Sequence, residues 1–247
     1  MKVLVTNDDG VESPGLHALA RGARDHGWDV VVAAPAEEAS GTGAGLTAAA
    51  GDTRRVAVER REVPGLAGVP VYAVAAHPGL IALLAAQGAF GEPPEVVLSG
   101  INLGANTGRA VLHSGTVGAA LTASLHGARA LAVSLDVAPD DETDPHWDTA
   151  VTVAAGLFDR LAALPPGSVL NLNVPDHAES GPPRRAGLAE SGTVRVHVED
   201  TGDGTIALSA ELAEDDLTPG SDAALLAEGH ATITALRSVA EDPDLVW

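Results

Sequence analysis

Cysteine is absent from this chain of 247 residues, and aromatic residues make up only 2% of it. The absence of cysteine excludes a disulfide-stapled fold and every thiolate metal site, and it fits a reducing compartment. With so few aromatic rings, a hydrophobic core has to be built from Ala, Val, Leu and Ile. Because 45% of the residues are hydrophobic and 19% are charged, the composition is that of a globular protein rather than a disordered one.

Basic residues are scarce as well. The chain has 14 Lys and Arg against 34 Asp and Glu, which gives a formal net charge of −20. A charge of this sign argues against a nucleic-acid duplex as a partner. Much of the acidic excess falls in residues 136–148 and 199–244, and we interpret it as a feature that favours solubility rather than as a binding surface.

Long hydrophobic runs are missing too. The apolar residues that open the chain end at Asp8 and Asp9, so no signal peptide is expected. Residues 63–91 carry no formal charge, but Pro64, Pro70 and Pro78 divide them into pieces too short to cross a bilayer as one helix. We therefore expect a soluble, cytoplasmic protein without a membrane partner.

The chain opens with the pattern of a βαβ unit. The β-branched run Lys2–Thr6 predicts a buried strand, and apolar residues at helical spacing after Pro14 predict a helix that closes at Gly27. A second apolar run, Asp29–Ala34, predicts the next strand. Two strands joined by a helix in this way are expected to be parallel.

The same alternation continues to about residue 135. It predicts an α/β protein with a Rossmann-like, doubly wound, mostly parallel sheet in residues 1–135. The expected strands are 56–58, 69–74, 95–98 and 130–135, and the expected helices are 78–90 and 114–126.

Residues 136–247 are expected to form a smaller C-terminal part. They predict a helix over 148–164, strands over 169–174 and 231–236, and a β-hairpin of 193–199 with 205–211. A lone two-stranded ribbon is only marginally stable in water. We therefore expect the hairpin to pack against another subunit, in a homodimer or homotetramer.

The loop after the first strand carries two adjacent carboxylates, Asp8 and Asp9. Two carboxylates at the carboxyl end of a parallel strand suit a hard divalent cation such as Mg²⁺ or Mn²⁺. The alternative is a solvated turn, because Asp-Asp-Gly is also ordinary turn sequence.

Three further polar, glycine-rich segments follow predicted strands. They are Ser40–Gly45, Ser99–Asn106 and His113–Gly118. The first could cradle a phosphate or be a flexible loop, and it lacks the ending of a Walker motif. The second offers amide groups to a metal or a phosphate, and the third offers the start of a helix to a phosphate or simply an N-cap. Loops that follow parallel strands meet at one edge of a sheet, so together they predict a metal-dependent site for a phosphorylated small molecule.

Several of these motifs resemble the SurE survival-protein family, whose members are divalent-metal-dependent nucleoside monophosphate phosphatases. The resemblance is carried by Lys2–Gly10, Ser40–Gly41, Ser99–Asn102, Ser114–Ala120, Asn171–Pro175 and Ser221–Ala223. It implies one divalent ion per subunit, Mg or Mn, held by Asp8, Asp9, Ser40 and Asn102. It also implies phosphate contacts from Asn106, Ser114, Gly115 and Thr116, and subunits that exchange C-terminal elements.

The chain departs from the family pattern around the expected pocket. Ala76–Leu80 stands where Gly-Thr-Pro-Ala-Asp is usual, His113 replaces a Tyr, and Thr122 replaces a Glu. These differences put nucleotide specificity in question. The alternatives are a phosphatase for a non-nucleotide metabolite, or a metal-dependent nucleotide-binding protein with little turnover.

Other hydrolytic chemistries are disfavoured by the sequence. No Gly-x-Ser-x-Gly elbow is present, and no two histidines have the His-x-x-x-His spacing of a zinc enzyme. His77 and His113 could protonate a leaving group or bind phosphate, or could simply fill space in their loops. In the expected phosphoester hydrolysis, the catalytic residues are Asp8 and Asp9. Either could orient or deprotonate a water, and direct attack by Asp8 stays open.

Overall fold

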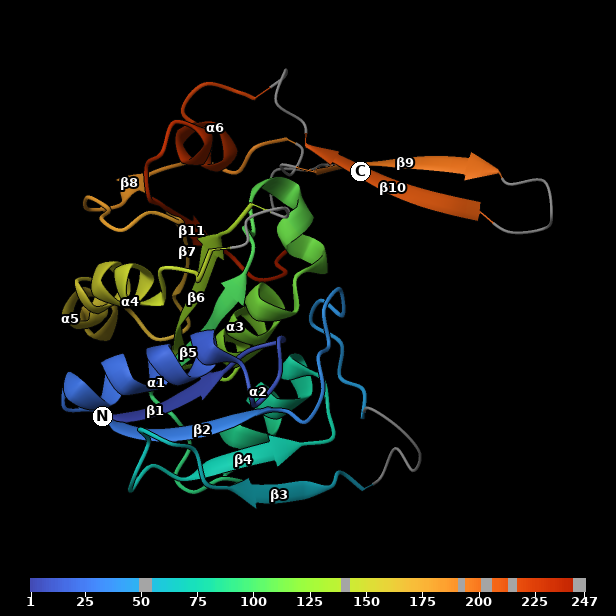
Figure 1. Ribbon diagram of the computed structural model, residues 1–247. Coiled ribbons are helices and arrows are strands. Elements are labelled where there is room, and N and C mark those ends of the chain that lie inside the picture. Colours follow the sequence, from blue (N-terminus) through green and yellow to red (C-terminus); the bar gives the residue numbers. More distant parts are fainter. Residues whose placement is uncertain (49–54, 139–142, 191–193, 201–205, 213–216, 242–247) are drawn as a thin grey trace.

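The computed structural model describes residues 1–48, 55–138, 143–190, 194–200, 206–212 and 217–241 (Figure 1). The strands are β1 (Lys2–Thr6), β2 (Asp29–Pro35), β3 (Val58–Arg61), β4 (Val71–Val74), β5 (Val96–Leu103), β6 (Arg129–Asp136), β7 (Val169–Pro175), β8 (Arg184–Arg185), β9 (Val194–Asp200), β10 (Ile206–Leu212) and β11 (Thr232–Leu236). The helices are α1 (Pro14–Asp25), α2 (Pro78–Ala86), the 3₁₀ helix η1 (Gly108–His113), α3 (Gly115–Leu125), α4 (Trp147–Ala155), α5 (Phe158–Ala163) and α6 (Asp222–Ala227).

One 9-stranded sheet organises the molecule, in the order β3-β4-β2-β1-β5-β6-β7-β11-β8. In this spatial order, every pair of neighbouring strands in the run β4-β2-β1-β5-β6-β7 is parallel. β3 pairs with β4, and β11 pairs with β7, in antiparallel orientation. The chain winds from β1 outward to β4 and then returns to place β5 on the other side of β1. Winding thus reverses between β1 and β5, and such a switch point opens a crevice at the carboxyl ends of the strands. The predicted α/β fold is confirmed.

Helices cover both faces of the parallel sheet, with α1, α4 and α5 on one side and α2 and α3 on the other (Figure 1). Leu16 of α1 and Phe158 of α5 belong to one buried cluster. Ile81 of α2 and Val117 of α3 belong to a second. The strands between these layers are therefore apolar on both sides, as parallel strands in such folds usually are.

The core is aliphatic, as the composition predicts. Phe158 is the one aromatic ring among the largest fully buried side chains of the described residues, and the others are Leu, Ile and Val. Across the described ranges, no helix combines the length and the apolar character that crossing a membrane requires.

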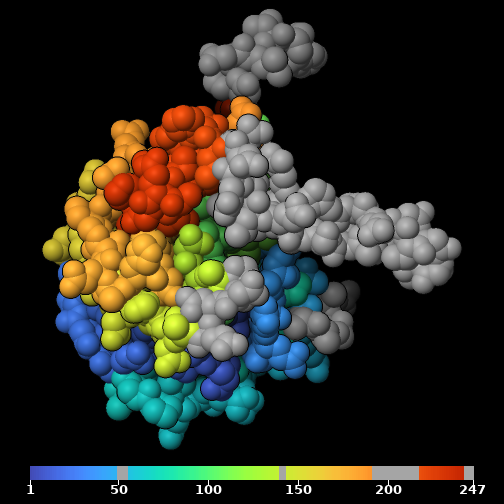
Figure 2. Space-filling model, turned by 45° about the horizontal axis from the view of Figure 1, so that its top comes forward, coloured from blue at the N-terminus to red at the C-terminus, as the bar shows by residue number. Residues whose placement is uncertain are grey.

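The C-terminal part extends the same sheet. β7 pairs with β6 in parallel, and β11 then pairs with β7, so the sheet runs across the expected boundary at residue 135. The division into 1–135 and 136–247 stays a prediction. Figure 2 shows the red C-terminal segment above the blue and cyan N-terminal segments on one face of the molecule.

The predicted β-hairpin is also present. β9 and β10 pair antiparallel, with Asp200 opposite Ile206, as a two-stranded sheet that lies apart from the main one (Figure 1). The residues that join the two strands, 201–205, lie outside the described residues.

Several predicted boundaries were wrong. The expected helix over 148–164 is two helices, because α4 ends at Ala155 and the poor helix former Gly156 follows. The expected strand 95–98 continues to Leu103 with a register shift against β6, so Asn102 lies on β5 itself. The helix expected over 78–90 ends at Ala86, and the strand expected over 56–58 begins at Val58. The short elements β8, η1 and α6 were not predicted.

Candidate active site

The loop after β1 is fixed by the side chain of Asn7. Its Nδ2 donates to the carbonyl of Gly10 at 3.0 Å, and its Oδ1 accepts from the amide of Gly10 at 3.2 Å. Gly10 has a φ of +99°, which an L side chain rarely adopts. This tight turn holds Asp8 and Asp9 at the carboxyl end of β1, beside the switch point.

Asp8 is nearly inaccessible to solvent, with 3% exposure. Burial raises the pKa of its carboxyl, and hydrogen bonds from the Thr116 hydroxyl and from nearby backbone amides, including those of Thr116 and Gly115, oppose that rise. The Thr116 Oγ1 also lies 3.3 Å from Oδ1 of Asn102. One hydroxyl at the start of α3 therefore joins the loop after β1 to strand β5, which brings Asp8, Asn102 and Thr116 together.

Asp9 is partly buried and lies between negative charges. Burial, followed by the charge of Asp8 and more weakly that of Glu38, raises the pKa of Asp9 to about 7, although the Leu103 amide opposes the rise. Its Oδ2 atom is buried and has no hydrogen-bond partner among the described residues. A buried carboxylate oxygen without a partner is costly unless a cation meets it. The donor set at this edge therefore fits a hard divalent cation.

Glycine is required where α3 begins. A Cβ on Gly115 would lie 2.8 Å from both Cβ and Oδ2 of Asp8, and a Cβ on Gly118 would overlap the carbonyl of Gly43. The absence of these side chains lets the first turn of α3 approach the carboxylate and the 40–45 loop. The first turn of a helix favours negative charge, and here Asp8 occupies that position.

The predicted ligand Ser40 lies in the neighbouring loop. This loop is tied to the first one by a 2.8 Å hydrogen bond from the amide of Ala39 to the carbonyl of Asp8. The exposed Ser40 hydroxyl donates to Glu38 Oε1 at 2.9 Å. Ser40 has no hydrogen bond to Asp8 or Asp9, and its hydroxyl bonds to Glu38 instead. Its oxygen keeps lone pairs that are free for a cation.

The predicted phosphate-binding residues lie in two places, the loop after β5 and the start of α3. Asn106 lies over β6 and β7, where its Nδ2 donates to Ser134 Oγ at 2.8 Å. Ser114 is the N-cap of α3, and its hydroxyl accepts from the amide of Val117 at 3.1 Å. Gly115 and Thr116, the next residues, face Asp8.

His77 and His113 flank the 40–45 loop. His77 precedes α2 without a side-chain cap, and its Nδ1 would be 3.7 Å from a Cβ on Gly45. The exposed His113 accepts a 3.1 Å hydrogen bond at its carbonyl from the amide of Gly43. Neither ring has a hydrogen bond to another described residue, so both stay available to a ligand.

The other two departures from the family pattern have structural roles. Leu80 packs against the cluster beneath α2 and α3, and the Thr122 hydroxyl donates to the carbonyl of Gly118 at 2.8 Å within α3. Leu80 and Thr122 therefore contribute to the packing and hydrogen bonding of α2 and α3.

Sequence reasoning did not identify Asn7 or Glu38 as part of this site. The sequence did carry a signal for Asn7, because Asn side chains in turns often hydrogen-bond to the backbone of the same turn. In the described ranges, this site included, no three His, Asp or Glu side chains gather as a metal cluster. A cation here must therefore also use amide or hydroxyl oxygens.

Comparisons with known proteins agree with this architecture. The family model described as "Survival protein SurE" matches residues 3–193. A 5'-nucleotidase SurE from Solidesulfovibrio magneticus is 37% identical over 245 residues, which cover 96% of this chain and 91% of the relative. One from Methanothermobacter thermautotrophicus is 39% identical over 209 residues, covering 81% and 77%. The crystal structure of the SurE protein from Aquifex aeolicus superposes with a TM-score of 0.76 at 25% identity, covering 96% of this chain and 93% of that one.

Proposed function

Because the chain belongs to the SurE survival-protein family, we propose that it is a divalent-metal-dependent phosphatase that hydrolyses nucleoside monophosphates, a 5'/3'-nucleotidase. The observation that carries this proposal is the meeting of Asp8, Asp9 and Asn102 at the switch-point crevice, with one buried carboxylate oxygen lacking a partner. An oxygen-rich donor set of this kind suits one Mg²⁺ or Mn²⁺ ion per subunit.

Four residues would hold the ion: Asp8, Asp9, Ser40 and Asn102. When bound, a divalent cation neutralises phosphoryl oxygens and makes a water molecule more acidic. Thr116 orients Asp8 through its hydroxyl, and a cation would displace the proton that the raised pKa favours on Asp9. These assignments explain why two carboxylates are kept so close together without a basic residue.

In the hydrolysis, water attacks phosphorus and the ester oxygen leaves with a proton. Asp8 or Asp9 would orient or deprotonate the attacking water, because both carboxylates lie at this edge of the sheet. Asn106, Ser114, Gly115 and Thr116 would hold the phosphoryl oxygens through N–H and O–H donors at the start of α3 and in the loop before it. His77 and His113, which flank the 40–45 loop, would protonate the leaving alkoxide.

Discrimination among nucleobases should be small. The described aromatic rings pack elsewhere: Trp28 against Phe158 at 4.6 Å, Tyr72 against Phe90 at 5.4 Å, and Trp147 against the core. If no Phe, Tyr or Trp ring of the described residues is there to stack on, a base contributes little binding energy through them. This observation favours a second candidate, a phosphatase for a non-nucleotide phosphorylated metabolite.

The deciding experiment is phosphate release from a panel of nucleoside and sugar monophosphates, with Mn²⁺, with Mg²⁺ and with chelator. Metal-dependent release from nucleotides with little preference among bases is expected. Release only from sugar phosphates would support the second candidate. Saturable nucleotide binding without release would instead indicate a binding protein.

We further propose that the protein works in the cytoplasm as a homodimer or homotetramer joined through β9 and β10. The two strands pair only with each other among the described residues, and such a ribbon needs a partner surface. Light scattering should give an oligomer, and deletion of residues 193–211 should reduce its size. A monomer at micromolar concentration, or an unchanged oligomer after the deletion, would contradict this.

A further inference from the structure

Two buried asparagines interrupt the apolar pattern of β7. Asn171 and Asn173 are fully buried, whereas their neighbours Leu172 and Val174 belong to the cluster on the opposite face. Val169, on the same face as the asparagines, belongs to the apolar cluster beneath α2 and α3. Burying two amides where aliphatic side chains would fit is costly unless their hydrogen bonds serve a purpose.

Both side chains hold the backbone of Asn106. Asn173 accepts from the amide of Asn106 through Oδ1 at 2.8 Å and donates to its carbonyl through Nδ2 at 3.0 Å. Asn171 donates to the same carbonyl at 2.8 Å. Asn173 therefore clamps both backbone groups of one loop residue, and Asn171 reinforces only one of them.

The side chain of Asn106 is fixed in turn by β6. Its Nδ2 donates to Oγ of the fully buried Ser134 at 2.8 Å. An amide nitrogen carries two hydrogens, so one N–H stays free for another acceptor. Ser134 pairs in register with Asn173 on one side and with Asn102 on the other. The clamp is thus built on the strands that neighbour the proposed cation site.

We infer that Asn173 is a positioning residue for phosphate binding. By fixing the backbone of Asn106, with Ser134 fixing the amide, it directs the free N–H toward a phosphoryl oxygen in the crevice. The inference rests on the proposed function through the phosphate role of Asn106. The side-chain hydrogen bonds of Asn173 go to the backbone of Asn106 and to none of the proposed cation ligands.

The first test uses inorganic phosphate as a competitive inhibitor in the presence of saturating Mn²⁺. Asn173→Ala should raise the inhibition constant for phosphate, and KM for the substrate, by about tenfold, the loss expected for one misplaced hydrogen bond. The melting shift produced by Mn²⁺ alone should stay that of the wild type. Ser134→Ala, a milder change, should raise the phosphate constant by a smaller factor.

The matched control is Thr232→Val. Thr232 pairs in register with Asn173, is fully buried, and has a hydroxyl without a hydrogen-bond partner among the described residues. This nearly isosteric change should leave phosphate affinity unaltered. If Asn173→Ala folds and keeps phosphate affinity within twofold of the wild type, the inference is wrong.

A pH signature separates positioning from general packing. In Asn173→Asp, a protonated carboxyl can fill the two roles that the amide has toward Asn106, one acceptor and one donor, whereas an ionised carboxylate offers only acceptors to the carbonyl of Asn106. The ratio of variant to wild-type phosphate affinity should therefore rise as the pH is lowered from 8.5 to 5. A ratio that does not change with pH contradicts the inference. The pH dependence of Asn173→Asp also tests the positioning role of Asn173 if Asn173→Ala does not fold.

The outcomes distinguish this inference from the proposed function. A wild type that binds phosphate but hydrolyses no ester removes the proposed hydrolysis and leaves the clamp to be judged by phosphate affinity. A wild type that binds no phosphate overturns the inference itself.

Discussion

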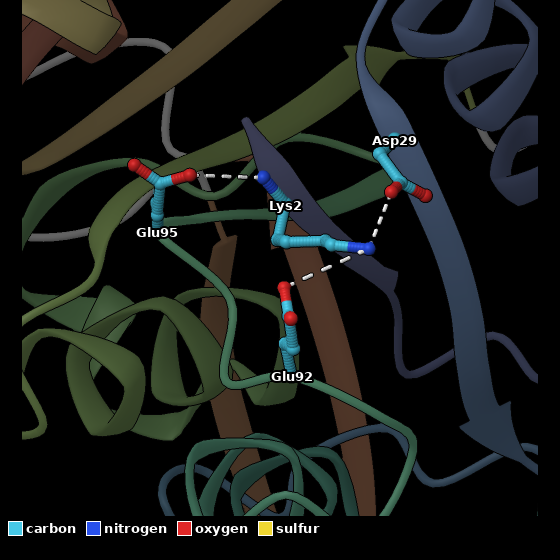
Figure 3. Close-up of polar contacts among 4 residues, drawn as sticks. All are labelled: Lys2, Asp29, Glu92 and Glu95. Atoms are coloured by element: carbon cyan, nitrogen blue, oxygen red, sulfur yellow. Dashed lines mark hydrogen bonds and ion pairs between the residues drawn. The ribbon is translucent and has the colours of Figure 1, made fainter.

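Acidic residues lie at both ends of strand β1, but those at the amino end are exposed and paired with a lysine, whereas those at the carboxyl end are largely buried without a basic neighbour among the described residues. At the amino end, the Lys2 ammonium pairs with Asp29 and lies 3.8 Å from a Glu92 oxygen, while the Lys2 amide donates to Glu95 at 3.1 Å (Figure 3). The Asp29 side chain is 62% exposed. Solvent screens these carboxylates and the Lys2 ammonium pairs with them, so their mutual repulsion lowers the folding stability very little.

At the carboxyl end, Asp8 and Asp9 are withdrawn from solvent without a basic neighbour. No Lys or Arg pairs with either carboxylate within the part of the chain that the structure describes. Burial raises the pKa of both groups. The comparison shows that acidic residues alone do not define a site. The informative feature is a pair of largely buried carboxylates without a basic side chain beside them, because their charge must then be neutralised by a bound cation.

The largest expected effect comes from removing one charge at the carboxyl end. Asp9→Asn keeps the shape of the side chain but should lower kcat/KM by about 10² or more, because a cation that stabilises the transition state contributes several kcal/mol. The variant should also lose most of the Mn²⁺-induced rise in melting temperature, since a ligand of the native state stabilises it by mass action. Phosphatase assays and melts with and without Mn²⁺ measure both.

The matched control is the same substitution at the other end of the sheet. Asp29→Asn removes an exposed, paired carboxylate and should leave turnover and the Mn²⁺ shift unchanged. Near-normal turnover and an undiminished Mn²⁺ shift in Asp9→Asn would mean that Asp8 and Asp9 are only a turn.

The next largest effect is a pH dependence of stability without metal. The pKa of Asp9 is 3.8 when unperturbed and about 7 in the folded protein, so the folded state binds more protons between these values. The stabilisation is full below pH 3.8 and is lost as the pH rises through 7, amounting to about 4 kcal/mol at most. In chelator, wild-type urea midpoints should fall from pH 4 to pH 8 more than those of Asp9→Asn. Parallel curves for the two proteins would contradict the burial of this charge.

Much of this architecture follows from local sequence. Strand-length apolar runs such as Lys2–Thr6, with helix signals such as Pro14, predict the parallel layers and therefore the edge at which the loops meet. Gly156 was the signal missed in the helix expected over 148–164. The continuation of β5 to Leu103 could not be predicted, because the residues from Ser99 to Asn102 pair irregularly with β6, and such irregularity depends on a distant strand.

The site was predictable as a set of loops but not as a set of contacts. Asp8 and Asn102 were expected at one edge, because parallel strands bring their carboxyl ends together. That Thr116 links them through its hydroxyl depends on how closely α3 approaches, which Gly115 permits. The hydrogen bonds between Asn173 and Asn106 join residues that are distant in sequence, and no local sequence pattern predicts such a pair.

A smaller effect is expected from crowding the carboxyl end without changing its charge. Gly115→Ala places a methyl group 2.8 Å from the Asp8 side chain, and overpacking of this kind costs about 1–3 kcal/mol. Displacement of Asp8 should also weaken Mn²⁺ binding. Gly181→Ala is the control, because its added Cβ would have no atom within 4 Å. Equal urea midpoints and equal Mn²⁺ affinities for the two variants would show that Gly115 has no role in placing Asp8.

The smallest effect is expected at the amino end of the sheet. The hydrogen bond to Asp29 raises the pKa of Lys2 above its ordinary value of 10.5, so the stabilisation is present below that pH and is lost as the pH rises through the folded-state value. Lys2→Met should lower the melting temperature only slightly at low salt, and 0.5 M NaCl should remove the difference, because exposed pairs are screened. Melts at both salt concentrations measure this, with turnover and Mn²⁺ binding expected to stay at wild-type values. A large, salt-resistant loss of stability would mean that the amino end also depends on a specific counter-charge, and the contrast between the two ends of β1 would then be wrong.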